Sequence, residues 1–383
     1  MDINNYETIK FLNNKFLNLY KFFNIIYNDD DNNNTSDNFD ILCIMHALKL
    51  LYDGIRGNNS RKNIKSQTHL EDILKYLPDP MRMRIAIFIR QGYNFNKKYR
   101  RKNHRALLES FIPTDIMRVN KINDLMDKKF PGWSEKFITH PVFDDCRLYI
   151  KNQTYFEGYW EVGFDVEKTK LRSFYCGDNK VINIPMMIKT GREEILTYNT
   201  NHVKFVSLPY NKENGYSMLI IMPEKPCNKE ELVNFCVNEL TGDDITNFYY
   251  SKGVKVTYGE KIMPKFKIIT NWELSSEDEC YFNPRANRFA PFMELMFNKN
   301  IRLQNIDENM ASDNTLVKMR SSSEIINEEK GTIIKSEVEI YECDDEDKTT
   351  VFPSYSSLII NKSFIWAVVN EDNVVTNIGT FVG

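Results

Sequence analysis

The first part of the chain carries hydrophobic residues at helical spacing. In Ile9–Tyr27 they recur at short intervals that place them on one face of a helix. Ile41–Tyr52 is apolar on nearly every side, which predicts a buried helix that ends at Gly54 and Gly57. The polar run from Asp29 to Asn38, DDDNNNTSDN, predicts a disordered loop between these two helices. Helical periodicity also occurs in Leu70–Tyr76, Ile116–Phe130 and Glu230–Leu240.

The later part of the chain is rich in strand patterns. Val181–Met222 and Val254–Ile269 combine β-branched residues with alternating polarity. Shorter strand-like runs are Ile85–Ile89, Leu148–Tyr155, Leu358–Ile360, Ile365–Val369 and Val374–Val382. Helices come first and strands later, without βαβ alternation, and this order favours an α+β fold. Because we find no internal repeat and no clear linker, we expect a single domain over residues 1–383.

One stretch near the C-terminus joins two opposite patterns. From Ile326 to Lys348 the sequence is INEEKGTIIKSEVEIYECDDEDK. Its centre, Ile334–Ile340, alternates with period two, as a strand with one buried face does. The acidic knot Asp344–Asp347 that follows has no place in a core. We therefore expect a strand that either joins a sheet or lies outside it as a loop.

Charge and hydropathy exclude several classes of protein. The chain has 50 Lys and Arg residues against 53 Asp and Glu, a formal net charge of -3. This near balance argues against a nucleic-acid or membrane binder that uses its whole surface. No apolar run reaches the roughly 18 residues of a membrane span. The polar start, MDINNYETIK, lacks the apolar core of a signal peptide, so we expect a cytoplasmic protein.

The spacing of the cysteines and histidines predicts neither a disulfide bond nor a metal site. None of the five histidines pairs with another at metal-ligand spacing. GxSxG, GxGxxG and P-loop motifs are missing, and no pattern nominates a Cys/His nucleophile. We expect neither an enzyme nor a metal or cofactor. The seven cysteines form no CxxC pair and are expected to be free thiols in a reducing compartment: Cys43, Cys146, Cys176, Cys227, Cys236, Cys280 and Cys343.

The run Lys97–Arg105, KKYRRKNHR, is the strongest local charge signal. With Tyr93, Phe95 and Tyr99 interleaved, it could contact phosphates or act as a nuclear address. A solvated helix face accounts for the same residues, and we favour that interpretation. Nucleic acid is therefore not an expected partner, although nuclear entry stays open.

Six stretches, in order along the chain, resemble the serpin family. A single one of these motifs has little specificity, whereas six in the family's order are specific. The resemblance runs from the first helix to the last residue. The matching stretches are LYDGIRGNN (Leu51–Asn59), NQTYFEGYWEVGFD (Asn152–Asp165), INIPMMIKTG (Ile182–Gly191), VSLPYNKENGYSMLIIMPEK (Val206–Lys225), MPKFKI (Met263–Ile268) and the closing NKSFIWAVVNEDNVVTNIGTFVG.

The resemblance implies a serpin fold, with three β-sheets, surrounding helices and a reactive loop over residues 331–353. Inhibitory serpins offer this loop to a protease and insert it into the main sheet after cleavage, driven by stored strain. The scissile region would contain Asp344 and Asp345. The hinge and insertable half would fall on Gly331, Thr332, Ile334, Ser336, Val338 and Ile340.

The hinge departs from the family pattern. Inhibitory hinges carry small residues after Gly-Thr, whereas Ile333, Ile334, Lys335 and Glu337 follow here. Bulky β-branched side chains pass slowly into an opening sheet, so a protease would complete hydrolysis and leave.

The region beneath the opening sheet also departs. Asn152 and Trp160 are kept, but the resemblance puts Asp40 and Cys43 at the family's serine positions at the start of the second helix. Ser321 falls near the place of the sheet-opening histidine. Two departures in the moving parts imply that inhibition is lost or altered.

The stretch from Asn59 to Ile85 is short for a serpin, so one helix is abridged, as in the cytosolic poxviral serpins, which the chain most resembles. Our first hypothesis is a cytosolic, viral serpin that inhibits weakly or not at all and binds a host protein to modulate host defence. The alternative is an inhibitor of an Asp-directed protease, of the caspase or granzyme B type, through Asp344 or Asp345. Small-molecule carriage has family precedent but no residue signal here.

The alternation also predicts how the strand would sit. We expect Thr332–Ile340 to lie in, or readily join, the main sheet. Inward burial would stabilise it by about 1.5–3 kcal/mol for each of its large apolar side chains, which are Ile334, Val338 and Ile340. The alternate side chains are expected to stay in water: Lys335, Glu337 and Glu339.

Overall fold

The computed structural model describes residues 6–27, 36–55, 70–142, 146–200, 202–211, 215–275, 288–289, 303–307, 310, 318–341 and 359–383. The helices are α1 (Tyr6–Tyr27), α2 (Ile41–Gly54), α4 (Leu70–Lys75), α5 (Lys97–Lys102), α6 (Ile116–Lys129), α7 (Lys229–Asn238), α8 (Gly242–Asn247) and the π-helical turn η1 (Phe248–Lys252). The strands are β1 (Asp37–Asp40), β2 (Arg82–Ile89), β3 (Leu107–Glu109), β4 (Leu148–Tyr159), β5 (Asp165–Tyr175), β6 (Val181–Asn199), β7 (Val203–Pro209), β8 (Ser217–Pro223), β9 (Val254–Pro264), β10 (Phe266–Ser275), β11 (Lys318–Asn327), β12 (Gly331–Tyr341), β13 (Phe364–Val369) and β14 (Val375–Phe381).

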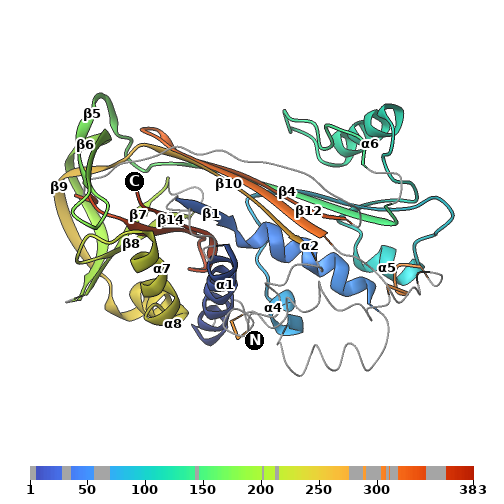
Figure 1. The fold of residues 1–383 in the computed structure, drawn as a ribbon, viewed down its shortest axis with the longest axis horizontal. Helices are drawn as coiled ribbons and strands as arrows, with labels where there is room; N and C mark the ends of the chain where they lie inside the picture. The colour runs from blue at the N-terminus through green and yellow to red at the C-terminus, as the bar shows by residue number, and fades with distance from the viewer. Residues whose placement is uncertain are drawn as a thin grey trace.

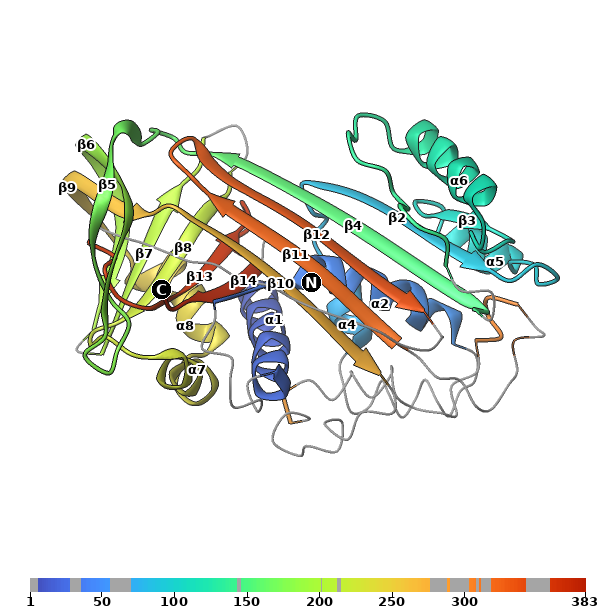
Figure 2. The same ribbon diagram turned by 45° about the horizontal axis from the view of Figure 1, so that its top comes forward.

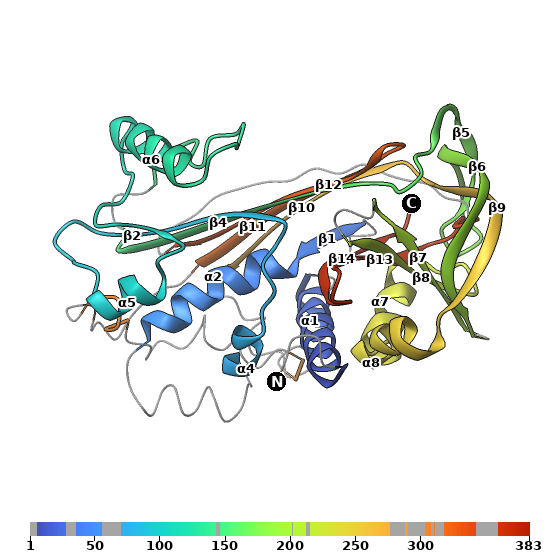
Figure 3. The same ribbon diagram turned by 180° about the vertical axis from the view of Figure 1, so that it is seen from behind.

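The main sheet has six strands in the order β10-β11-β12-β4-β2-β3. Helix α2 lies against one face of this sheet and α6 stands over the other (Figure 1). Figure 3 shows α2 next to the main sheet, with α1 and α4 on the side of α2 that faces away from the sheet. In Figure 2, α6 lies over the β2–β3 side of the sheet, where it packs on Ala86, Phe88 and Tyr149. Helices thus pack on both faces of the sheet, and the α+β class is confirmed.

The second sheet has eight strands in the order β1-β14-β13-β8-β7-β6-β5, with β9 also paired to β6. The first half of β6 pairs with β5 and its last residues pair with β7. The sequence resemblance implies three sheets, whereas the described strands form two hydrogen-bonded sheets. The reason is the long strand β6, which pairs with β5, β7 and β9 and so joins two of the three expected sheets into one. Its pairing with β9 has a register shift between Thr190 and Glu193.

Helix α2 is buried along almost its whole length, as the all-apolar pattern predicts. All of its residues except Lys49 are buried. It begins where the Asp40 carboxylate accepts a hydrogen bond from the Cys43 amide, a regular N-cap. It ends at Gly54 with Ile55 as the C-cap, so Gly54 belongs to the helix and Gly57 lies outside the described residues.

Two predictions at the edges of elements were wrong. Asp37 and Asn38 belong to β1 and pair with β14, although their composition predicts a loop. Their register opposite Thr380 and Gly379 supplies the backbone partners that a local sequence window cannot show. Ile359 and Ile360 form no strand, and Leu358 lies outside the described residues.

The basic run forms the short helix α5 and the turn after it. Its cations are exposed, while Tyr99 is buried and donates a hydrogen bond to the carbonyl of Leu50 (2.9 Å). A solvated helix face is thus confirmed for the charged residues.

Candidate functional site

Strand β12 lies in the middle of the main sheet. Every residue from Gly331 to Tyr341 has an antiparallel partner on β4, and all but the first have one on β11. Figure 2 shows β12 between these two strands over most of their length. The strand predicted over Thr332–Ile340 is confirmed, and it lies inside the sheet of the uncut chain.

The inward face of β12 is fully buried. Val338 and Ile340 pack in the core that contains α2, and Ile334 packs in the core between the two sheets. Each large apolar side chain contributes about 1.5–3 kcal/mol of burial. The inward side chains and their exposed fractions are Thr332 1%, Ile334 1%, Ser336 4%, Val338 0% and Ile340 2%.

The outward charges of β12 stay partly in water: the side chains of Lys335, Glu337 and Glu339 are 41%, 34% and 24% exposed. Lys151 on β4 is 4% exposed, and its ammonium lies 2.5 Å from Glu339 and 3.0 Å from Glu337. Tyr149 donates a hydrogen bond to Glu339 (2.8 Å), and Gln153 donates one to Glu337 (2.6 Å). The carboxylates are held because the register sets β4 donors beside them.

The pKa values show that these charges support one another. Burial by itself would lower the pKa of Lys151, but the carboxylates of Glu339 and Glu337 outweigh burial and the pKa is raised. Burial would raise the pKa of Glu339, but Lys151 and the Tyr149 hydroxyl outweigh it, so this pKa is lowered. Both groups therefore remain charged near neutral pH.

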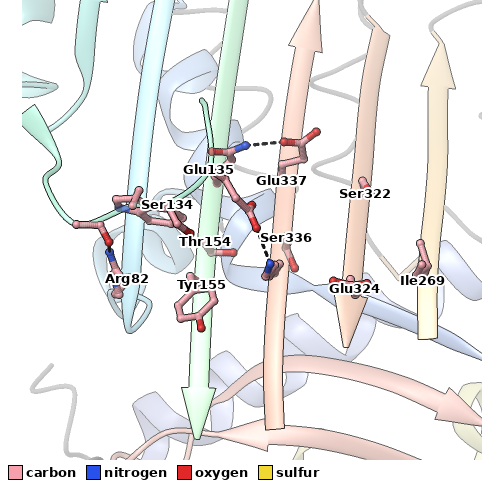
Figure 4. A pocket seen from close by; sticks show the side chains of 14 residues that line it. Arg82, Ser134, Glu135, Thr154, Tyr155, Ile269, Ser322, Glu324, Ser336 and Glu337 are labelled. Carbon is pink, nitrogen blue, oxygen red and sulfur yellow. Dashed lines mark hydrogen bonds and ion pairs between the residues drawn. The ribbon is translucent and has the colours of Figure 1, made fainter. Parts of the chain in front are cut away.

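The segment that follows α6 covers the outward face of β12. Glu135 in this segment pairs with Lys335 at 2.5 Å, and Arg84 on β2 donates a hydrogen bond to the Glu135 carbonyl (2.8 Å). A cavity of about 440 Å³ lies between this segment and the strands, with Lys335, Ser336 and Glu337 in its floor (Figure 4). The ion pair joins this segment to β12, but both side chains are exposed (41% and 56%), so it contributes only about 0–1 kcal/mol.

The predicted sheet-opening residues meet beneath β12. Asn152 donates a hydrogen bond to the carbonyl of Cys43 (2.9 Å), which joins β4 to the first turn of α2. The Asp40 carboxylate accepts hydrogen bonds from the Cys43 amide (2.8 Å) and from the Thr154 hydroxyl. Burial raises the pKa of Asp40, and hydrogen bonds from its neighbours, Ser336 on β12 among them, partly oppose this. Asp40 therefore fills the serine position as a helix cap.

A row of hydroxyl groups extends this contact across the sheet. Ser323 on β11 and Ser336 on β12 share a hydrogen bond of 2.7 Å, and Asn38 donates one to Ser323 (2.7 Å). Ser321, near the expected histidine position, donates to the carbonyl of Glu337 (3.1 Å). Ser321 and Ser323 thus find hydrogen-bond partners on β12, whereas the buried Oδ1 atoms of Asn38 and Asn152 have none among the described residues.

Trp160 holds the turn from which β12 begins. It follows the end of β4, stacks on Tyr210 with ring centroids 4.6 Å apart, and its indole donates a hydrogen bond to the carbonyl of Glu328 (2.9 Å). Its amide donates to the carbonyl of Lys330 (3.0 Å). Gly331 follows directly, so the aromatic side chain fixes the hinge end of the strand.

Substitution of Gly331 by Ala is expected to destabilise the hinge by about 1–3 kcal/mol. An added Cβ would lie 2.0 Å from the carbonyl oxygen of Gly158 and 2.8 Å from the Cα of Tyr159, both backbone atoms of a paired strand. Thermal unfolding measures the loss. Gly259→Ala is the matched control, because its Cβ would meet no atom within 4 Å. An equal melting temperature for both variants would contradict a tight hinge.

The structure groups most of the predicted site residues and adds others. Asp40, Cys43 and Asn152 come together with β12, whereas Asp344 and Asp345 lie outside the described residues. The sequence analysis missed Tyr149, Lys151 and Glu135. A signal for Lys151 was available, since a lysine in a strand pattern needs a carboxylate partner if it is buried.

Comparison with known proteins agrees with this geometry. Residues 21–383 match the family described as Serpin (serine protease inhibitor). Iripin-8 of Ixodes ricinus is 28% identical over 196 residues, which cover 49% of this chain and 46% of that protein. An uncharacterised serpin-like protein of Methanosarcina acetivorans is 31% identical over 191 residues, 49% of this chain and 42% of its own length. The chain belongs to the serpin family, and these matches span less than half the length of those curated relatives.

Solved structures show the same fold at low identity. Cleaved Serpin 42Da superposes with a TM-score of 0.70 at 13% identity and covers 100% of this chain and 99% of its own. The thermophilic serpin tengpin in the latent state gives a TM-score of 0.65 at 17% identity, over 98% and 97% of the two chains. Within the described residues, none of the helices is both long and apolar enough to cross a membrane.

Proposed function

We propose that this serpin keeps its reactive-loop strand in the main sheet without cleavage, and that it acts as a protein-interaction module which inhibits proteases weakly or not at all. The observation that carries the proposal is the full pairing of β12 on both sides. A loop offered to a protease as bait must lie outside the sheet, and here its first half is already a core strand.

The neighbouring structures support an inserted state of this kind. Tengpin is described in the latent state, and Serpin 42Da and an ovalbumin mutant are described as cleaved, the latter also as loop-inserted. The chain resembling them is uncut, and so the latent arrangement is the closer analogy. If insertion is already complete, little strain remains to distort a captured protease.

The proposal includes a cytoplasmic setting, a viral source and a host protein as partner. The likeness to cytosolic poxviral serpins in the abridged stretch after Asn59 supports the first two. The five described cysteines are free and buried, as thiols of a reducing compartment would be: Cys43, Cys146, Cys176, Cys227 and Cys236.

Incubation of the uncut chain with a protease panel tests the proposal. We expect no covalent complex that survives denaturation, and we expect cleavage within 342–353 to raise the melting temperature by less than about 4 °C, the equivalent of roughly 1 kcal/mol. Caspases and granzyme B belong in the panel, because the alternative function requires attack after Asp344 or Asp345. A covalent complex with one of them, or a large rise in melting temperature on cleavage, would establish the inhibitor instead.

A further inference from the structure

A basic surface lies at one end of the main sheet, away from the hinge. Residues Lys97–Arg105 contain six Lys or Arg and no Asp or Glu, in a chain whose net charge is -3. The last turn of α6 adds Lys128 and Lys129 beside them, because Lys129 donates a hydrogen bond to the carbonyl of His104 (3.0 Å). We call these two segments the α5–α6 basic surface. The proposed insertion of β12 into the main sheet does not explain why these basic residues gather here.

Part of this charge has no partner among the described residues. Lys102 pairs with Asp53 at 2.5 Å and Arg105 with Asp79 at 2.8 Å. The other six cations of this surface are exposed and have no ion pair within the described chain: Lys97, Lys98, Arg100, Arg101, Lys128 and Lys129. An array of this kind raises the local concentration of anions and favours an acidic partner.

A cavity beside the same surface narrows the class of partner. It has a volume of about 360 Å³, and Arg105 and Lys129 are among the residues that line it. Its remaining lining is apolar except for Asp79, which Arg105 already pairs: Pro80, Met83, Ile85 and Phe130. A mainly apolar cavity with Lys129 in its lining, next to the exposed cations of α5, fits a hydrophobic side chain flanked by carboxylates.

Other polyanions match these features less well. Of the aromatic residues interleaved with the basic run, Phe95 and Tyr99 are turned inward, 7% and 3% exposed, and Tyr93 is partly buried against the core, so they offer little ring surface for base stacking. A sulfated polysaccharide or a duplex backbone carries charge but no apolar group to fill the cavity. We propose that the α5–α6 basic surface binds an acidic peptide segment of a partner protein, with one apolar side chain in the cavity. This proposal does not depend on whether the loop inhibits proteases.

Fluorescence anisotropy with two labelled heptapeptides, DEDFDED and DEDSDED, tests the proposal. We expect the first to bind the full-length protein more tightly than the second, and both to weaken as salt is added. The triple variant Lys97→Glu, Lys98→Glu, Arg101→Glu should lose at least about tenfold in affinity. The control reverses three exposed lysines elsewhere, Lys170, Lys180 and Lys225, and should bind as the parent does. Met83→Ser should bring DEDFDED to the affinity of DEDSDED.

Several results would overturn the proposal. If DEDFDED and DEDSDED bind with equal affinity, the cavity does not hold an apolar side chain. If the control triple variant loses as much affinity as the Lys97 triple variant, binding is not specific to the α5–α6 basic surface. Tighter binding of a heparin octasaccharide or a 12-base-pair duplex than of DEDFDED, lost in the Lys97 triple variant, would assign the surface to a different polymer. If replacing Asp344, Asp345 and Asp347 by Asn strengthens peptide binding, the chain's own acidic segment is the occupant. Thermal unfolding of each variant confirms that it is folded.

Discussion

Replacing Ile334 and Val338 together by Asp should lower the melting temperature by roughly 15 °C, the largest change expected of any double substitution in the loop. Both side chains are at most 1% exposed and pack in the two cores on the inward side of the sheet. Each change removes about 3 kcal/mol or more of packing and leaves a carboxylate buried without a cation. Together the two substitutions should cost about 6 kcal/mol or more, a large part of a typical unfolding free energy. We therefore expect β12 to leave the sheet in this variant.

Calorimetry before and after cleavage within 342–353 measures this effect. Proteolysis between Gly331 and Tyr341 is expected in the double variant and not in the parent, because a paired central strand is protected. Leu171→Asp with Ile269→Asp is the matched control, with the same change of charge at strand positions that are 66% and 41% exposed. If the Ile334 and Val338 variant melts where the parent does, both before and after cleavage, the segment is only a tether.

Replacing Lys151 by Met should cost about 3 kcal/mol at pH 8, because Glu339 and Glu337 would lose their buried cation. The sign of the pH dependence should also reverse. In the parent, the pKa of Glu339 is lowered by folding, so its contribution is present above the ordinary value and lost as the pH falls through the folded value. The pKa of Lys151 is raised, so its contribution is lost only at high pH. The parent network is therefore complete from about pH 5 to about pH 10.

In the Lys151→Met variant, only the Tyr149 hydroxyl and the charge of Arg320 still oppose burial, and the pKa of Glu339 should rise above its ordinary value. The variant should then gain stability as the pH falls through that raised value, whereas the parent loses it. Urea unfolding from pH 4 to pH 8 measures both trends. Lys267→Met is the control, because Lys267 pairs with Glu324 on the same face but is 54% exposed, and such pairs contribute about 0–1 kcal/mol. If the unfolding free energies of Lys151→Met and the parent change with pH in the same way, Lys151 does not stabilise the charged carboxylates of Glu337 and Glu339.

The sequence alone determined the elements whose signal is local. The periodic apolar positions of 9–27 and 41–52 predicted α1 and α2, and the alternation of Ile334–Ile340 predicted the inward face of β12. These predictions held because each depends on side chains a few residues apart, whose spacing alone decides which face can be buried. Six motifs in order were enough to indicate the family.

Only the tertiary structure decided where β12 lies and what its charges do. The sequence allowed a strand inside the sheet or a loop outside it, because both have the same local pattern. The partners that distinguish the two states come from β4, from β11 and from the segment after α6, up to 200 residues away in the case of Glu135 and Lys335. Glu337 and Glu339 look like exposed residues in any local window, and they become half-buried partners of the buried Lys151 because the register places it beside them. Pairing between distant segments, rather than local pattern, determines which carboxylates remain in water.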